Sequence, residues 1–599
     1  MKSLSKTQFL DQAKKDLAEK TSAINVAVAE LKSMVEKKIG NRRFVAGRDR
    51  IVEAQVLAYN QKRLLEFEKL EKSPYFFKCL VQFKNAAVPE EVYISKFNFS
   101  EEKIYSWFSS ISCLRFTEIG EFSYATPKGE ERSGALIGKD QFMIVDGRIV
   151  YLASEAVDRP RELIYQEHLS NRKSGFVLPE VIAKMEKNQD EVIRADYRGS
   201  YLIAGPAGSG KTTLALHRVA YLAQSPDTSE YFSGKNIIVF VQDQSTLDYF
   251  KSIFPQLGIE DVIITTFYQW ALDHLGFLDF EYAYRFGPDE AAKDGYEQAK
   301  RLALAEMRVD RNLQNADDLA AYYRSFLDET NLSIFAEQAK AKKLDRFDIA
   351  VLLAHRFERD QGFKKEERVV VAKKNGDMKL ENRILPIEYS LIILDEAQNY
   401  LKEEIAMIKA LANKNKAILY TGDLAQQTKL FTLRDWNEVG EDFGNGHKVV
   451  LDKVYRNTKE ILRYVQARGY AVCIPDELKS GPEVEEKHFD SKADEINFVR
   501  ELVGKKDDLT IGILNKSKEY LADYLKVFED YKNTHVLSVS EAQGVEFDVS
   551  ILVGQIEKYE FDCEDEGFKK EKTRVERDLD YVALTRAMEE MWVCFVVSQ

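Results

Sequence analysis

The chain contains 599 residues, and its 86 basic and 99 acidic side chains give a formal net charge of −13. At about 100–200 residues per domain, this length predicts roughly three to five domains, and a content of 45% hydrophobic residues excludes an intrinsically disordered chain. Because attachment to phosphate backbones scales with the available Lys and Arg, so acidic a chain is expected to contact nucleic acid only through a local groove.

Two long helices are predicted at the start of the chain, over residues 1–72. Apolar side chains recur at close to heptad spacing from Leu10 to Met34, and again from Ile51 to Leu70. Two glycines lie in the segment between these runs, where a helix is expected to break. The pattern predicts a helical hairpin, either as a coiled-coil arm that projects from the body or as a pair packed flat on it.

The next segment, residues 73–177, changes to short runs of aromatic and β-branched side chains that end in turn residues. Examples are SPYFFKCLVQF, EEVYIS and QFMIVDGRIVYL. Such runs are typical of β-strands joined by tight turns. We predict a small β-rich module with an antiparallel sheet, followed by a linker.

From residue 178 onward, apolar strands alternate with amphipathic helices, which predicts the α/β fold class with parallel sheets covered by helices. The first block comprises residues 178–272 and 386–446, and the second block comprises 447–599. Between the two parts of the first block, residues 273–385 are highly charged and have a helical pattern. This segment is predicted to be a helical insertion.

A glycine-rich stretch follows the apolar strand YLIA and matches the pattern GxxxxGK[ST] from Gly205 to Thr212. A loop of this kind, placed between a strand and a helix, surrounds phosphates with backbone N–H groups at the positive end of the helix. Lys211 is then expected to reach the β- and γ-phosphates, and the Thr212 hydroxyl to bind Mg²⁺. The predicted ATP-binding residues of this loop are Gly205, Gly208, Ser209, Gly210, Lys211, Thr212 and Thr213.

Two adjacent acidic residues, Asp395 and Glu396, follow the apolar run from Leu391 to Leu394. At the carboxyl end of a parallel strand, Asp395 is placed to hold Mg²⁺, and Glu396 to orient and deprotonate an attacking water. A strand that ends in Asp-Glu is by itself common at solvated sheet edges. Together with the phosphate loop, it predicts an enzyme that hydrolyses ATP with Mg²⁺.

The sequence DEAQ at residues 395–398, placed after a phosphate loop, resembles the UvrD/Rep-type superfamily 1 helicases and translocases, whose fold contains two RecA-like P-loop domains. The resemblance implies that Gln189 reads the adenine edge and that Gln426 in GDLAQ senses the γ-phosphate. It also implies that the TTF element lines a track for single-stranded nucleic acid. The candidate contacts there, with core packing as the alternative, are Thr266, Phe267, Tyr268 and Trp270.

The second block carries the remaining motifs of this family. Tyr455-Arg456 matches the YRS/T motif, which implies that Tyr455 stacks on adenine and that Arg456 reaches the γ-phosphate. SEAQGVEFD resembles the AKGLEFD motif, with Glu546 near the ribose and Gly544 beside it, and Arg586 in VALTRA would be an arginine finger. Two domains would then close around MgATP once per turnover. The catalytic set implied by the resemblance is Lys211, Glu396, Gln426, Arg456 and Arg586.

Within the superfamily, the chain most resembles HelD-like factors, which remove RNA polymerase from nucleic acid. The resemblance is carried by the N-terminal helix pair, by QEHL and EKNQDEVIRA ahead of AGSGKTTLALHRVAYL, and by IIVFVQDQSTLDYFKSIFPQLGIEDVIITTFYQWA. Ser106-Trp107-Phe108 departs from the DWRxP element that is usual at that point, and only its tryptophan matches. The resemblance implies RNA polymerase and single-stranded nucleic acid as partners.

Two other functions remain open. A stand-alone translocase or DNA helicase in repair or phage defence would use the same motor, and an ATP-gated adaptor would act mainly through protein contacts. The segment between Arg456 and Ser540 is too short for a large duplex-gripping insertion, so efficient strand separation is not expected.

Five widely spaced cysteines with no CxxC pair predict neither a disulfide framework nor a zinc site. The sequence has no stretch of about 18 uncharged apolar residues, and charges interrupt its first residues every few positions. We therefore expect a cytoplasmic protein that does not contact a membrane.

Overall fold

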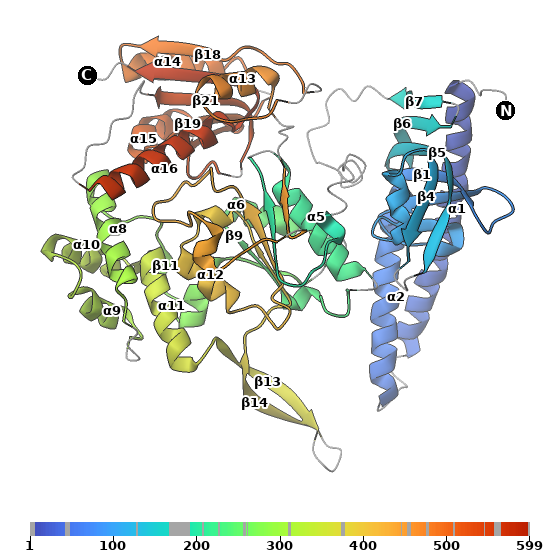
Figure 1. Ribbon diagram of the computed structural model, residues 1–599, viewed down its shortest axis with the longest axis horizontal. Helices are drawn as coiled ribbons and strands as arrows, with labels where there is room; N and C mark the ends of the chain where they lie inside the picture. The colour runs from blue at the N-terminus through green and yellow to red at the C-terminus, as the bar shows by residue number, and fades with distance from the viewer. Residues whose placement is uncertain are drawn as a thin grey trace. The chain divides into compact units, whose positions relative to one another are not determined.

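The computed structural model divides into two units by its internal contacts (Figure 1). Unit 1 consists of Met1–Arg194, His217–Tyr231 and Phe254–Glu260, and unit 2 of Ala195–Leu216, Phe232–Ile253 and Asp261–Gln599. The residues that the structure describes are 6–41, 48–126, 130–157, 159–166, 192–206, 209–225, 228–242, 244–254, 259, 261–308, 313–372, 378–444, 446–451, 457–474, 478–506, 509–543, 545–555 and 565–596.

Two helices lie side by side in unit 1, α1 (Lys6–Asn41) and α2 (Arg48–Lys72) (Figure 1). In the first part of α1, Leu17 and Ile24 are buried together with Phe67 of α2, in a core that also includes side chains of the neighbouring sheet. Farther along α1, Met34 is 50% exposed and Ile39 is 52% exposed. The helix pair is therefore packed on the sheet at one end, whereas Met34 and Ile39, farther along α1, are open to solvent.

A seven-stranded sheet follows in unit 1, in the order β3-β2-β1-β5-β6-β7, with β4 paired to β5. Its strands pair antiparallel except β2 with β3. The strands are β1 (Phe77–Phe83), β2 (Glu90–Ser95), β3 (Ile104–Ser106), β4 (Gly120–Ala125), β5 (Glu131–Val145), β6 (Arg148–Ala156) and β7 (Arg159–Gln166). Two short 3₁₀ helices lie between strands, η1 (Ser100–Glu102) and η2 (Ser110–Arg115).

Trp107, in the element that departs from the DWRxP pattern, lies in the interior of unit 1 and is 2% exposed. Its ring meets that of His217 edge to face, with 5.2 Å between centroids. The guanidinium of Arg194 donates to the backbone oxygens of Trp107 at 3.0 Å and Phe108 at 3.1 Å, and to the Ser112 hydroxyl at 2.7 Å. Trp107 is therefore a core residue of unit 1, although the flanking residues of the DWRxP pattern are missing.

The first sheet of unit 2 is parallel throughout, in the order β10-β9-β15-β16-β8-β17. Its central strands are continuous apolar runs that are buried on both faces, as parallel sheets between helices require. The strands are β8 (Ser200–Ala204), β9 (Ile237–Val241), β10 (Ile263–Thr266), β15 (Leu391–Leu394), β16 (Ile418–Gly422) and β17 (Lys448–Val450). The helices along this part of the chain are α5 (Lys211–Gln224), α6 (Gln244–Ile253), α7 (Phe267–Leu275) and α12 (Lys402–Lys409), with η3 (Gly234–Asn236), η4 (Ala397–Asn399) and η5 (Trp436–Val439).

In its described residues, the segment between α7 and β15 contains four helices and two small strand pairs. The helices are α8 (Glu290–Ala305), α9 (Ala316–Tyr323), α10 (Glu329–Lys340) and α11 (Arg346–Asp360). The strands are β11 (Glu281–Tyr282) with β12 (Lys343–Leu344), and the antiparallel hairpin β13 (Lys364–Ala372) with β14 (Met378–Pro386). This hairpin projects from the rest of unit 2 (Figure 1).

The second sheet of unit 2 is also parallel, in the order β18-β22-β21-β19-β20. The strands are β18 (Glu485–Phe489), β19 (Ile511–Asn515), β20 (Thr534–Ser538), β21 (Phe547–Gln555) and β22 (Ala587–Val596). The helices are α13 (Lys459–Ala467), α14 (Lys492–Val503), α15 (Lys518–Val527) and α16 (Glu566–Leu584). The fold is thus α/β, as predicted, with a six-stranded and a five-stranded parallel sheet in unit 2.

Two details of unit 2 differ from the sequence-based expectation. The predicted helical insertion at 273–385 contains the antiparallel β13–β14 hairpin, and β13 carries the β-branched run VVV at residues 369–371. The predicted second block begins at residue 447, but β17 pairs with β8 in the first sheet. No described helix is long and apolar enough to cross a membrane.

Candidate active site

The glycine-rich loop begins where β8 ends and leads into α5. Gly205 has φ +149°, and a Cβ there would collide with the backbone oxygen of Leu451, so only glycine fits. The Lys211 side chain is 6% exposed, and its Nζ donates to the backbone oxygens of Gly205 at 2.8 Å and Pro206 at 3.1 Å. The ammonium is thus bound to the backbone at the start of the loop.

Asp395 follows β15 at the carboxyl edge of the same sheet and is 4% exposed. Its Oδ1 lies 3.4 Å from the Thr212 hydroxyl and also accepts a hydrogen bond from Thr421. Burial, together with the charge of Glu396, raises the pKa of Asp395 to about 7. A buried carboxylate beside a hydroxyl is the kind of hard-oxygen donor set that suits Mg²⁺.

Glu396, next to Asp395, has a strained backbone with φ +50° and ψ +48°. Its Oε2 accepts a hydrogen bond from Gln398 Nε2 at 2.6 Å, while Gln398 Oε1 accepts from the backbone N–H of Asp423 at 3.1 Å. A Cβ at Gly422 would collide with that amide. The glycine and the Gln398 amide thus hold the Glu396 carboxylate in one direction, a role that the sequence analysis did not assign to Gln398.

Gln426 comes to the same edge of the sheet from the loop after β16. It is 4% exposed, and its Nε2 donates to Asp423 Oδ2 at 2.6 Å. Its backbone oxygen lies 3.4 Å from Gln398 Nε2. Gln426 and Glu396 thus both contact the Gln398 amide, and the role of Gln426 toward the γ-phosphate stays a prediction.

Arg586 lies between the end of α16 and the start of β22, in the part of unit 2 that contains the second sheet, and is 4% exposed. In the described residues its guanidinium has neutral acceptors, with Nε donating to Val582 O at 3.0 Å and Nη1 to Val545 O at 3.4 Å. Burial lowers the pKa of Arg586, and the charge of Glu396 opposes this shift. A buried cation whose charge is felt by Glu396 is suited to receive an anionic group.

Several predicted residues are not tested by these contacts. Gln189, Gly208, Tyr455, Arg456 and Gly544 lie outside the described residues. Ser209 is buried, Gly210 has φ +89°, and Thr213 and Glu546 are half-buried. Their roles toward a nucleotide stay predictions.

The predicted nucleic-acid residues begin α7. Thr266 is the N-cap of this helix, and its hydroxyl accepts from the backbone N–H of Gln269 at 3.1 Å. Phe267 is fully buried, and Tyr268 is 3% exposed and stacks on Tyr282 with 3.8 Å between centroids. The rings of Phe267 and Tyr268 are therefore packed in the core, which was the alternative to base stacking. Trp270 is half-buried, and its contact with bases stays a prediction.

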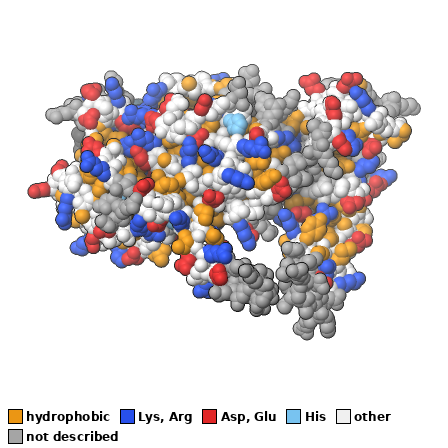
Figure 2. All heavy atoms as spheres, turned by 60° about the horizontal axis from the view of Figure 1, so that its bottom comes forward, with side chains coloured by type: hydrophobic (Ala, Val, Ile, Leu, Met, Phe, Trp, Pro, Cys, Tyr) orange, Lys and Arg blue, Asp and Glu red, His pale blue; other side chains and the backbone are white. Residues whose placement is uncertain are grey.

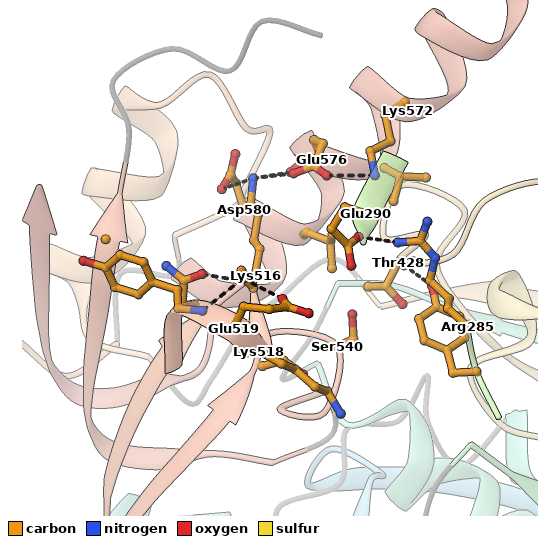
Figure 3. A pocket seen from close by; sticks show the side chains of 18 of the residues that line it. Arg285, Glu290, Thr428, Lys516, Lys518, Glu519, Ser540, Lys572, Glu576 and Asp580 are labelled. Atoms are coloured by element: carbon orange, nitrogen blue, oxygen red, sulfur yellow. Dashed lines mark hydrogen bonds and ion pairs between the residues drawn. The ribbon is translucent and has the colours of Figure 1, made fainter. Parts of the chain in front are cut away.

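A large pocket of about 1130 Å³ lies between the carboxyl ends of the second sheet's strands, α16 and the segment before α8 (Figure 3). Its cations are paired with carboxylates: Arg285 Nη1 lies 2.7 Å from Glu290 Oε2, and Lys516 Nζ lies 2.8 Å from Asp580 Oδ1. Acidic and basic side chains therefore both line this pocket, an arrangement that the sequence analysis did not predict. The basic residues that line it are Arg285, Lys293, Lys343, Arg468, Lys516, Lys518 and Lys572.

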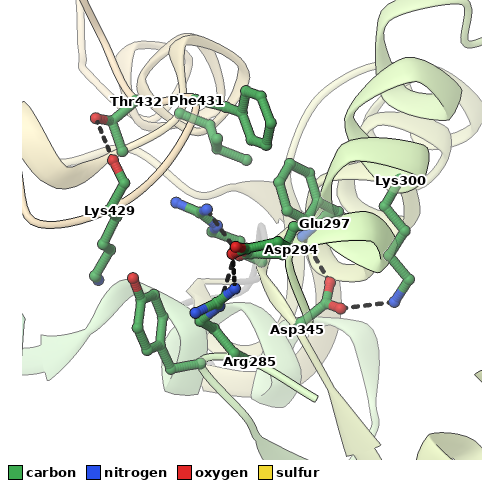
Figure 4. A network of polar contacts seen from close by, with 12 residues as sticks. Arg285, Asp294, Glu297, Lys300, Asp345, Lys429, Phe431 and Thr432 are labelled. Atoms are coloured by element: carbon green, nitrogen blue, oxygen red, sulfur yellow. Dashed lines mark hydrogen bonds and ion pairs between the residues drawn. The ribbon is translucent and has the colours of Figure 1, made fainter. Parts of the chain in front are cut away.

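A buried polar network stands behind this pocket (Figure 4). Arg285 pairs with Asp294, and Glu297 Oε2 lies 3.0 Å from Arg285 Nε. On the other side of Glu297, its Oε1 lies 2.9 Å from Nη2 of the fully buried Arg346. Buried charges of this kind keep one arrangement because each would be costly without its partner. The network therefore makes the α8 side of the pocket rigid.

Comparison with known proteins gives partial similarities. No protein-family model matches the sequence. The chain is 23% identical over 309 residues to the ATP-dependent DNA helicase PcrA of two Staphylococcus epidermidis strains. This match covers 47% of the chain and 39% of those helicases, so it spans about two fifths of the relatives' length. The crystal structure of the C-terminal domain of a possible DNA helicase from Lactobacillus plantarum is 22% identical, with a TM-score of 0.19, over 24% of this chain and 89% of that one.

Proposed function

We propose that this protein is an ATP-hydrolysing motor of the superfamily 1 type that acts on nucleic acid. Its two parallel sheets would be two RecA-like domains, with the helix pair at 1–72 as an arm and 273–385 as an insertion. The observation that carries the proposal is the Thr212 hydroxyl, 3.4 Å from Asp395 Oδ1 at one sheet edge, with Lys211 and Glu396 next to these two residues in the chain. Arg586 would act on this group from the part of unit 2 that contains the second sheet. The partial similarity to ATP-dependent DNA helicases supports it.

ATP would bind at the carboxyl edge of the first sheet. The backbone N–H groups of the glycine-rich loop and the Lys211 ammonium would hold its phosphates. Thr212 and Asp395 would hold Mg²⁺, because they supply a hydroxyl and a buried carboxylate oxygen 3.4 Å apart. When bound, the metal ion supplies charge neutralisation to the phosphate oxygens.

Hydrolysis would follow from the position of two side chains. Glu396 orients a water and takes its proton while the water oxygen bonds to the γ-phosphorus and the bond to the bridging oxygen breaks. The electron pair of that bond leaves with ADP. Arg586, from the part of unit 2 that contains the second sheet, neutralises charge on the transferred phosphoryl group. While the γ-phosphate is present, this attraction favours approach of the two α/β parts of unit 2, one built on each sheet.

The pocket of Figure 3 is the proposed place for single-stranded nucleic acid. Over the face shown in Figure 2, basic and acidic side chains are interspersed, so binding would depend on local cations. Lys516 and Lys518 follow β19 at the mouth of this pocket, where phosphates could replace their carboxylate partners. We expect Lys516→Ala and Lys518→Ala to weaken the stimulation of ATP turnover by single-stranded DNA, whereas Lys526→Ala, an exposed control on α15, should not.

For the partner of the motor, the first candidate is RNA polymerase, which the protein would release from nucleic acid by ATP-driven closure. Its support is the resemblance of the N-terminal segments and the phosphate-loop flanks to HelD-like factors. The second candidate, a stand-alone single-strand translocase or DNA helicase, is supported by the partial similarity to PcrA. Recovery of core RNA polymerase with the purified protein at physiological salt supports the first, and its absence favours the second.

The proposed activity is tested by phosphate release from ATP in the purified full chain. We expect the parent protein to turn over ATP, and Lys211→Ala and Glu396→Gln to abolish turnover while the proteins remain folded. Undiminished hydrolysis in both variants would refute the site. A parent protein that hydrolyses no ATP, with or without single-stranded DNA, would refute the function itself.

A further inference from the structure

Gln543 links the two α/β parts of unit 2 at the candidate site. It lies in the loop between β20 and β21, two strands of the second sheet, and its side chain is 8% exposed. Its Oε1 accepts from Asn399 Nδ2 at 3.0 Å and from the Thr428 hydroxyl at 2.9 Å. Its Nε2 lies 3.5 Å from Glu396 Oε2. One amide of the second part therefore contacts three side chains of the first.

The orientation of the Gln543 amide, oxygen against nitrogen, follows from a backbone N–H group, which can only donate. The backbone N–H of Thr428 donates to Asn399 Oδ1 at 3.0 Å, so Nδ2 of Asn399 must face Gln543. Oε1 of Gln543 then accepts, and its Nε2, the donor, faces the Glu396 carboxylate. The chain of hydrogen bonds runs from the loop after β16, through Asn399 and Gln543, to Glu396.

We propose that Gln543 is a positioning residue for Glu396, which rests on the proposed ATP hydrolysis. Gln398 already donates to Glu396 Oε2 from the same loop, at 2.6 Å, and supplies one fixed bond. The bond from Gln543 is at the outer limit of hydrogen-bond length, and such bonds often tighten when reactants bind. Because Gln543 belongs to the second part, Glu396 is fully oriented only when the two parts approach each other. Hydrolysis is thereby coupled to closure.

The first test removes the donor and keeps the size of the side chain. We expect Gln543→Met to lower kcat for ATP by about ten- to a hundred-fold, because a hydrogen bond to a charged group is lost. KM for ATP should stay near the parent value, since the hydrogen bonds of the Gln543 side chain go to Asn399, Thr428 and Glu396 and to none of the described residues of the phosphate loop. Gln466→Met is the matched control: its amide on α13 donates to Val472 O at 2.7 Å, and its kcat should equal the parent's.

Two further variants separate positioning from packing. Gln543→Glu keeps the acceptor for Asn399 and Thr428 but opposes Glu396 with like charge, so kcat should fall at least as far as in Gln543→Met. Gln543→Lys restores a donor and should recover part of the lost kcat, which a purely packing role would not allow. Because Gln543→Glu preserves the bonds to Asn399 and Thr428, it tests the idea even if the Met variant fails to fold.

The outcomes against the inference are distinct from failure of the proposed function. If Glu396→Gln abolishes turnover but both Gln543→Met and Gln543→Glu keep the parent kcat, the site stands and the inference is overturned. A change in melting temperature or KM without a change in kcat overturns it as well. A parent protein without ATP turnover refutes the proposed function instead, and the inference with it.

Discussion

The Asp578 carboxylate on α16 accepts a hydrogen bond from the backbone N–H of Gln427, with 3.0 Å between Gln427 N and Asp578 Oδ2. Gln427 follows Gln426 in the loop after β16, whereas α16 leads to Arg586. Two turns earlier in α16, Glu571 accepts from the backbone N–H of Phe431 at 2.8 Å. Two hydrogen bonds from backbone N–H groups to carboxylates of α16 thus join the loop of the first sheet to the helix that precedes Arg586, so movement of α16 changes both sides of the site together.

Replacing Asp578 with Asn should alter the pH dependence of stability. Burial raises the pKa of Asp578 from about 3.8 to about 6, despite the Gln427 bond and Arg574. The folded protein therefore binds this proton more tightly than the unfolded chain, and the associated stability is lost as pH rises through about 6. Asn keeps an acceptor for Gln427 without the charge. We expect its melting temperature to match or exceed the parent's at pH 7.5, with the difference closing near pH 4.

That prediction is checked by thermal unfolding followed by circular dichroism at intervals between pH 4 and pH 8. The variant curve should separate from the parent curve in the window between the two pKa values. A variant that is much less stable than the parent at pH 7.5, yet equal to it at pH 4, would show that the charge of Asp578 is stabilising.

Arg586→Ala should separate nucleotide binding from hydrolysis. Because the guanidinium is expected to act on charge that develops in the transition state, its loss should lower kcat by about a thousand-fold and leave KM for ATP within a few-fold. Steady-state phosphate release measures both quantities. Arg577→Ala is the control, since Arg577 is exposed on the same helix and donates to the backbone oxygen of Gly469. An equal loss in both variants would point to damage of α16 rather than loss of a catalytic cation.

The candidate ATP site could be predicted from the sequence because the residues proposed for it belong to short local motifs. Lys211 and Thr212 belong to one contiguous loop, and Asp395 directly follows an apolar strand. In a parallel sheet, carboxyl ends of strands share one edge, so the two motifs had to meet once both strands were assigned to the same sheet. The structure brings Thr212 and Asp395 to 3.4 Å.

The parts that the sequence did not reveal depend on partners distant in the chain. Gln543 has no property of its own that points to Glu396, because the contact exists only after two sheets are built and docked. The burial of Phe267 and Tyr268 likewise depends on what covers α7, since the same aromatic letters suit a core or a stacking surface. β17 has three residues, too few for the sequence to indicate which sheet it joins.

Gly205→Ala should abolish nucleotide binding. The backbone at this position has φ +149°, which alanine rarely adopts, and the added Cβ would collide with the backbone oxygen of Leu451. The loop would have to move away from the start of α5, where the phosphates are expected. Titration with a fluorescent ATP analogue measures the loss. Gly504→Ala is the matched control. Gly504 has φ −63°, and a Cβ added there would lie 3.4 Å from its nearest neighbour, the backbone oxygen of Arg500.

Lys300→Met should destabilise the segment of helices α8–α11 more than any exposed lysine substitution there. The ammonium is fully buried between Asp345 Oδ2 at 2.6 Å and Asp348 Oδ1 at 2.7 Å. Without it, two adjacent carboxylates remain buried with no countercharge, which costs about 3–5 kcal/mol.

Urea denaturation followed by tryptophan fluorescence and circular dichroism should place the midpoint of the variant well below that of the parent. Lys340→Met, an exposed position on α10, should change the free energy of unfolding by no more than about 0.5 kcal/mol. The burial of Asp345 raises its pKa to about 7 even with Lys300 present. Loss of the cation should therefore favour protonation of Asp345, and the deficit of Lys300→Met should be smaller at pH 5 than at pH 8. A deficit that is independent of pH would show that the cost comes from lost packing and not from the unpaired charges.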